Sequence, residues 1–173
     1  MSELTTICIN VASSFIFIFI LLILFKPKLI ISPFVCKYTY VDGKEYFFIK
    51  MINISCFSAH DIKIELLEVD RYSAANGQMN QRFRPLSVVL DHVSHIPGYR
   101  PSWLRKNAPY AIIFRTSEDI NSILTNDYKA IMIKVSLRHG LTGLVKVATK
   151  EYTDETQIKN GKFKYGLKFG SIN

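Results

Sequence analysis

The chain has 173 residues, enough for one domain of ordinary size and a terminal element. Hydrophobic residues make up 49% of it, and the formal net charge at pH 7 is +8. Nine tyrosines and twelve phenylalanines argue against a disordered basic tail, because disordered chains are poor in aromatic residues. The basic surplus favours anionic neighbours such as lipid head groups, nucleic acid or acidic proteins.

An uncharged, strongly apolar stretch runs from Ile7 to Phe25. A helix of about 20 such residues crosses the hydrocarbon layer of a bilayer. A cleaved secretory signal would begin with basic residues and end at small ones, whereas this stretch ends at "KPK". A core helix would show a polar face, which "FIFIFILLILF" lacks. The sequence therefore predicts a retained transmembrane helix over 7–25.

The basic residues around this stretch indicate its orientation. No Lys or Arg precedes it, while Lys26, Lys28 and Lys37 follow it. The positive-inside rule then predicts a short extracytoplasmic N-terminus over 1–6 and a cytoplasmic C-terminal part, as in a single-pass protein of a bacterial inner membrane. We expect these three lysines to contact anionic head groups, at about 1 kcal/mol each.

Polar residues in the first half of the predicted span share one helical face. These residues are Thr6, Asn10, Ser13 and Ser14. They either form a stripe through which spans associate, or lie at the outer interface with the serines bonded to their own backbone. The pattern leaves both interpretations open.

Beyond a basic linker over 26–31, apolar and polar residues alternate with a period of two. In chain order, this pattern predicts strands over 33–40, 45–55, 60–70, 84–91, 108–116, 128–140, 144–153 and 161–169. "DG" at 42–43 predicts a tight turn between the first two strands.

Helical character is rare beyond the predicted span. One short helix is expected within 117–126, with Ser117 as its N-cap. Polar loops are expected over 73–81 and 95–107. The pattern predicts a mainly β domain over 32–173, an antiparallel immunoglobulin-like β-sandwich, with a small β-barrel as the alternative.

Catalytic and metal-binding patterns are weak. Cys8, Cys36 and Cys56 show no metal-type spacing, and we expect reduced thiols. "DHVSH" (91–95) offers a carboxylate and a histidine pair, but no second ligand cluster accompanies it, so surface loop histidines are expected. No nucleophile, phosphate-loop or zinc-protease motif occurs in the chain. The sequence predicts a protein that is not an enzyme and needs no cofactor.

The predicted loop "YRPSWLRK" (99–106) interleaves aromatic and basic residues. Such a segment can rest on a membrane or on a neighbouring subunit, and it can also stack on bases. We expect the former, which makes nucleic acid the less favoured partner. The expected contact residues are Tyr99, Arg100, Trp103 and Arg105.

The order of these features resembles the cytoplasmic immunoglobulin-like domain of inward-rectifier potassium channels. The likeness lies in "FVCKYTYVDGKEYFFIKMINIS", in "AHDIKIELLEV", and in a closing pattern of Tyr152, Ile158 and "GLKF" at 166–169. It implies a β-sandwich that assembles around an axis beneath the membrane and senses a ligand or lipid. The chain departs from the family in having one predicted span, no pore helix and no T-V-G-Y-G filter, so potassium selectivity is not implied.

The favoured function is a membrane-anchored, non-enzymatic β-sandwich that self-associates and binds a ligand, lipid or partner. It would act as a regulatory subunit or membrane effector, for instance in antiviral defence. One alternative is an ion-conducting oligomer of single spans. Two others are a membrane-tethered enzyme that uses Asp91, His92 and His95, and a nucleic-acid binder.

Overall fold

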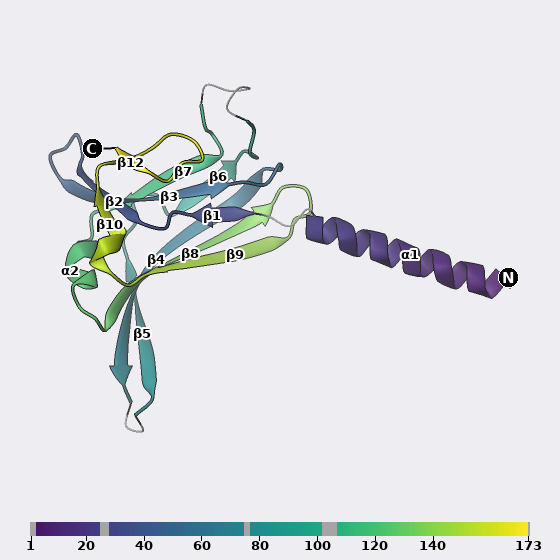
Figure 1. The fold of residues 1–173 in the computed structure, drawn as a ribbon, viewed down its shortest axis with the longest axis horizontal. Helices are drawn as coiled ribbons and strands as arrows, with labels where there is room; N and C mark the ends of the chain where they lie inside the picture. The colour runs from purple at the N-terminus through teal and green to yellow at the C-terminus, as the bar shows by residue number, and fades with distance from the viewer. Residues whose placement is uncertain (1–2, 25–27, 75–76, 102–106, 173) are drawn as a thin grey trace.

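The computed structural model describes residues 3–24, 28–74, 77–101 and 107–172. It is mainly β, with one long helix at the N-terminal end (Figure 1). The helices are α1 (Glu3–Leu24) and α2 (Ile120–Leu124), with a 3-10 turn at Glu155–Gln157. The strands are β1 (Leu29–Ile31), β2 (Val35–Thr39), β3 (Glu45–Asn53), β4 (Ala59–Ser73), β5 (Met79–Leu86), β6 (His92–Ile96), β7 (Ala111–Thr116), β8 (Lys129–His139), β9 (Val145–Tyr152), β10 (Ile158–Asn160), β11 (Lys162–Phe163) and β12 (Ser171–Ile172).

The strands form two five-stranded sheets and a small ribbon. In the first sheet, β3 pairs with β7 on one edge and with β1 and then β2 on the other, and β10 pairs with β2. In the second sheet, β4 lies between β8 and the pair β5 and β6, and β9 pairs with β8. The predicted β fold is confirmed, but the first sheet is mixed because β10 runs parallel to β2, whereas all pairs of the second sheet are antiparallel.

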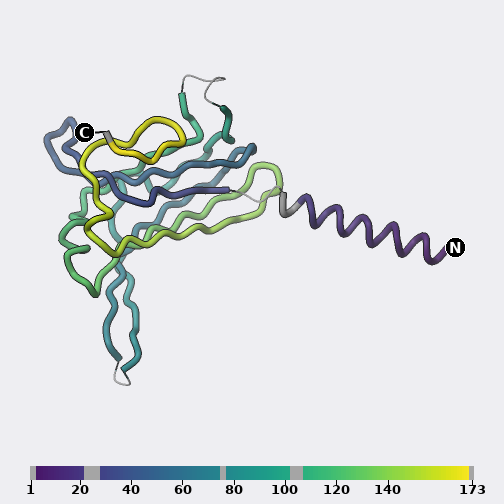
Figure 2. Tube along the Cα trace, in the orientation of Figure 1, coloured from purple at the N-terminus to yellow at the C-terminus, as the bar shows by residue number. Residues whose placement is uncertain are grey.

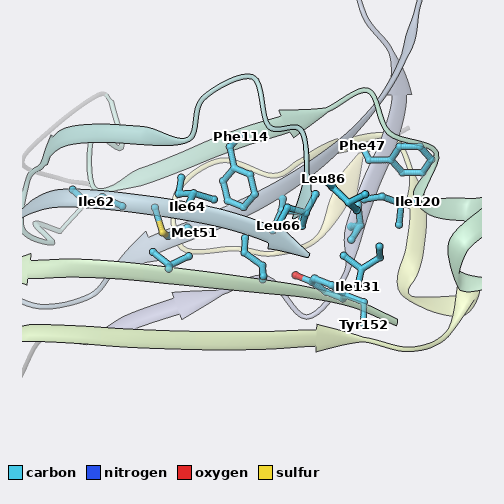
Figure 3. Close-up of a cluster of buried hydrophobic side chains, with 14 of the residues drawn as sticks. Phe47, Met51, Ile62, Ile64, Leu66, Leu86, Phe114, Ile120, Ile131 and Tyr152 are labelled. Atoms are coloured by element: carbon cyan, nitrogen blue, oxygen red, sulfur yellow. The ribbon is translucent and has the colours of Figure 1, made fainter. Parts of the chain in front are cut away.

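The core lies between the facing sides of the two sheets (Figure 3). Ile64 and Leu66 of β4, with Ile131 of β8, face Met51 and Phe114 of the first sheet. Lys63 and Glu65 point outward, as the alternation in β4 predicts. Burial of each such aliphatic side chain contributes about 2 kcal/mol to the stability of the sandwich.

Strand β3 is buried on both faces. Its side chains from Phe47 to Asn53 are all buried, and Phe48 lies with Phe34 and Cys36 in a second apolar cluster. This second cluster is covered by Phe163 and Phe169 from the end of the chain. The C-terminal segment therefore forms a partial third layer over the first sheet.

Helix α1 is exposed along the part whose side chains the structure describes. Its longest apolar window, Glu3–Leu21, has no buried residue, and the helix projects away from the sheets (Figures 1 and 2). It is long and apolar enough to cross a membrane. The helix begins within the predicted 1–6 segment, and β1 lies inside the predicted 26–31 linker.

Several local predictions differ from the structure. The strand expected over 84–91 is not formed as such, since β5 ends at Leu86 and β6 begins at His92. Asp119 caps α2 instead of Ser117, because its carboxylate accepts from the amides of Asn121 and Ser122. The predicted loop 73–81 is shorter, since β5 already begins at Met79 and forms a projecting hairpin with β4 (Figure 2). The strand predicted over 161–169 ends at Phe163, because the chain then curls around a buried side chain from β3.

Candidate functional site

Lys50 of β3 is a charged residue whose side chain is buried, with only 2% of its surface exposed. Lys50 lies on the outer face of β3, beneath the C-terminal segment. Its ammonium donates to three backbone carbonyl oxygens, those of Lys164 (2.7 Å), Gly166 (2.5 Å) and Lys168 (3.0 Å). Burial lowers the pKa of Lys50, yet three acceptors require three N–H donors, which only the charged ammonium supplies.

The segment that supplies these carbonyls is a closed loop, residues 164–170, called here the C-terminal loop. The amide of Lys164 donates to the carbonyl of Gly170 (2.7 Å), which joins the two ends of the loop. Gly166 has a φ of +67°, a left-handed conformation that favours glycine and turns its carbonyl toward Lys50. A buried charge thus holds together strands and a loop that are more than a hundred residues apart in sequence.

Cys36 lies beside this buried charge. Burial is the largest effect on its thiol and raises its pKa to about 11, while the positive charges of Lys159 and Lys50 act in the opposite direction. A thiol with a raised pKa is a poor nucleophile at neutral pH. Cys36 is therefore part of the apolar packing beneath the loop.

A cleft of about 430 Å³ lies against the C-terminal loop. Its walls come from the loop itself and from two tyrosines that flank the connection between β6 and β7. The lining residues are Tyr99, Tyr110, Lys164, Tyr165, Gly166, Leu167 and Lys168. We call it the tyrosine cleft, and its size is within the range of small-ligand sites.

The tyrosines of this cleft are held by specific contacts. The rings of Tyr99 and Tyr110 meet edge to face, with centroids 5.1 Å apart. Backbone bonds position both residues, from Tyr99 N–H to Ser55 O and from Asn53 N–H to Tyr110 O. Burial raises the pKa of Tyr110, and the neighbouring Tyr165 and Tyr99 hydroxyls raise it further. The three tyrosines thus line one site, and Tyr110 stays a neutral donor at neutral pH.

Several strand ends meet where α1 leaves the β domain, at a surface called here the α1-side end. Strand β1 begins there, opposite the last residue of β3 (Leu29 with Asn53). The pairings of Ala59 with His139 and with Ile96 place the start of β4 beside the ends of β8 and β6. The β8–β9 turn at this end exposes apolar side chains, those of Leu141, Leu144 and Val145.

The three lysines predicted to contact lipid head groups do not lie together at the α1-side end. Lys26 lies outside the described residues. Lys28 is exposed at the α1-side end, and its carbonyl accepts from Ile54 N–H. Lys37 pairs in register with Phe47, six residues along β3 from Asn53, so it lies about 20 Å from that end. Its ammonium forms an ion pair with Glu45 (3.0 Å).

The polar residues predicted on the span are all exposed on α1. Ser14 donates to the carbonyl of Asn10 (2.9 Å), as expected for a serine that bonds its own helix backbone. Thr6 and Ser13 lie on the same helix, and a shallow groove runs beside Asn10 and Ser14. Within the described chain, no protein group bonds the side-chain amide of Asn10.

The predicted loop residues are only partly visible. Trp103 and Arg105 lie outside the described residues, while Tyr99 and Arg100 are described. Tyr99 lines the tyrosine cleft, and Arg100 is exposed beside it in sequence. Sequence reasoning chose Tyr99 as a surface contact and missed the cleft, because the other walls come from the chain's last residues.

The histidines of "DHVSH" form no metal site among the described residues. His95 pairs across strands with His60, with ring centroids 4.9 Å apart, and His92 is exposed at the start of β6. The carbonyl of Asp91 accepts from Ile64 N–H (2.7 Å). Asp91 thus supports a strand with its backbone.

No family model matches the chain, and no curated protein matches its sequence. Among solved structures, one similar chain is described as "X-ray structure of Northeast Structural Genomics Consortium target SoR45". It shares 14% identity with a TM-score of 0.38, over 73% of this chain and 83% of that chain. A similarity this weak supports no inference about function.

Proposed function

We propose that the protein is a single-pass, membrane-anchored binding protein whose β domain lies at the cytoplasmic surface of the bilayer. The observation that carries this proposal is that no residue is buried in the apolar window of α1 within Glu3–Leu21. Such a helix is unstable in water and is covered when lipid surrounds it. The lysines beyond α1 support the cytoplasmic orientation by the positive-inside rule, and we take the membrane to be a bacterial inner membrane.

The α1-side end supports a close approach of the domain to the bilayer. Exposed Leu141 and Leu144 lie at this end together with Lys28, a combination of apolar and basic groups that suits a lipid surface. Lys37 is too far from this end to belong to the same contact. The domain would therefore rest on the membrane through the turns at its α1-side end.

Association of two or more copies through α1 is part of this proposal. The side-chain amide of Asn10 would find its hydrogen-bond partners on another span, and the small side chain of Ser14 allows close approach. Assembly beneath the membrane is also what the resemblance to inward-rectifier channel domains implies. An Asn10→Leu variant should lower the oligomer mass in lipid nanodiscs, whereas Phe19→Leu on the opposite helix face, outside this groove, should leave that mass unchanged.

Extraction at alkaline pH tests the anchoring directly. The full chain should stay in the membrane pellet at pH 11, and a shortened chain that begins at Lys28 should appear in the soluble fraction as a folded domain. Recovery of the full chain in the soluble fraction would contradict the proposal. An insoluble shortened chain would show that the β domain holds the membrane by itself.

A further inference from the structure

The tyrosine cleft is positively charged, and none of its described lining residues is acidic. Lys164 and Lys168 line it, and in the described part of the chain neither ammonium has a carboxylate within ion-pair distance. The closing segment 158–172 holds four lysines and no Asp or Glu. The buried ammonium of Lys50 lies directly behind the loop. The local field therefore favours an anion.

The backbone of the C-terminal loop adds oriented donors. Every described peptide is trans, so the C=O and N–H of one peptide unit point in opposite directions. Because the carbonyls of Gly166 and Lys168 point at Lys50, the amides of Leu167 and Phe169 point away from it. Within the described chain, neither amide has a protein acceptor. Lys50 thus fixes peptide dipoles with their positive ends outward, an arrangement that binds anions.

The tyrosines supply the remaining features of a ligand site. Tyr110 is 4% exposed, so its ring forms the floor of the cleft, and Tyr165 is 57% exposed at the rim. Phenol hydroxyls donate to anionic oxygens, and the rings offer flat apolar walls. A volume of about 430 Å³ holds a small molecule and excludes a nucleic-acid duplex.

We propose that the tyrosine cleft binds a small phosphate-bearing anion. The phosphoryl oxygens accept from the Leu167 amide, from the tyrosine hydroxyls and from the ammonium groups of Lys164 and Lys168. The tyrosine rings pack against the organic part of the ligand. The phosphate belongs either to a soluble metabolite or to a lipid head group. This inference names the ligand class of the binding protein proposed above and rests on that function, but it is tested separately from anchoring.

Phenyl phosphate is the probe, because it combines a phosphate monoester with one aromatic ring. It is titrated into the full chain in phosphatidylcholine nanodiscs and followed by ³¹P NMR and calorimetry. We expect saturable binding, and at least a tenfold loss of affinity in the double variant K164Q/K168Q. The matched control K44Q/K63Q removes the same charge from exposed sites outside the cleft and should change the affinity less than twofold.

A second titration distinguishes the two phosphate sources. Nanodiscs that contain 20% phosphatidic acid should raise the apparent Kd of phenyl phosphate if the cleft takes head groups. An unchanged Kd assigns the cleft to soluble ligands, and either result is compatible with the proposal. Absence of saturable binding, or an equal loss in both double variants, would overturn the proposal. Because alkaline extraction measures anchoring alone, such a failure would leave the membrane proposal untouched.

Discussion

The two sheets each bury one charged side chain, and they stabilise it in different ways. Glu68 of the second sheet is 4% exposed and lies between two cations, Arg84 on β5 and Lys129 on β8. Lys50 of the first sheet has no carboxylate partner in the described chain and donates to three backbone carbonyls. The ion-pair partners of Glu68 lie on the two strands next to β4, whereas the carbonyls that bind Lys50 lie in the C-terminal loop. The ion pairs of Glu68 therefore link neighbouring strands of one sheet, whereas the hydrogen bonds of Lys50 fix the conformation of the C-terminal loop.

Removal of the Lys50 ammonium should lower the free energy of unfolding more than any other substitution proposed here. Lys50→Met keeps the apolar stem but leaves three loop carbonyls without donors, so we expect a loss of about 3 kcal/mol in the free energy of unfolding. Urea denaturation of the shortened chain measures it. Trypsin should also cut sooner after Lys164 and Lys168, because the C-terminal loop is released. Lys63→Met, at an exposed position, is the control and should leave both readouts unchanged.

Neutralisation of Glu68 should lower the free energy of unfolding by a smaller amount, which depends on pH. Burial by itself raises the pKa of Glu68, but hydrogen bonds and attraction from Lys129 and Arg84 outweigh it and hold the pKa below the ordinary value of 4.5. The stabilisation is therefore fully present above pH 4.5 and is lost as the pH falls through the lowered pKa. Glu68→Gln should lose about 2 kcal/mol at pH 7.

Urea midpoints of the wild type and Glu68→Gln at pH 7 and pH 3 measure this difference. The difference in urea midpoint between the two proteins should be smaller at pH 3 than at pH 7. A gap of equal size at both pH values would mean that Glu68 acts by packing alone, and it would remove the contrast with Lys50.

Substitution of Gly166 in the C-terminal loop should lower stability because of its left-handed backbone conformation. Gly166→Ala places a Cβ on a residue with a φ of +67°, so we expect a loss of about 1 kcal/mol from strain. Gly143→Ala, in the β8–β9 turn, has the same φ and open space around it. The two variants should be destabilised alike, but only Gly166→Ala should weaken phenyl phosphate binding, since its Cβ lies 3.4 Å from the Tyr110 hydroxyl.

An exposed ion pair should give the smallest effect. Glu65 and Lys134 pair at 3.1 Å on the outer face of the second sheet, where water screens both charges. Glu65→Gln should change the free energy of unfolding by less than about 0.5 kcal/mol. A loss comparable to that of Glu68→Gln would show that burial does not set the hierarchy described here.

The sequence predicts the elements of this fold better than it predicts the site. Alternation in β4 and β8 locates their buried faces correctly, because one side of each strand meets the core. The apolar run in β3, which only Lys50 interrupts between Phe47 and Ile52, is the signal of a strand buried on both faces. The partners of Lys50 were not predictable, since backbone carbonyls carry no residue signature. The valines of β9 face solvent, because β9 is an edge strand whose inner side is filled by Ala148 and Tyr152.

Cysteine labelling tests the central claim, that α1 anchors the β domain on the cytoplasmic face, most directly. Cys56 is exposed near the α1-side end and Cys36 is buried, so a Cys8→Ser variant offers one reactive thiol in the domain. A membrane-impermeant maleimide should label it in inverted vesicles, and the label should stay in the pellet after alkaline extraction. Labelling in right-side-out vesicles, or loss of the label to the soluble fraction, would contradict the account.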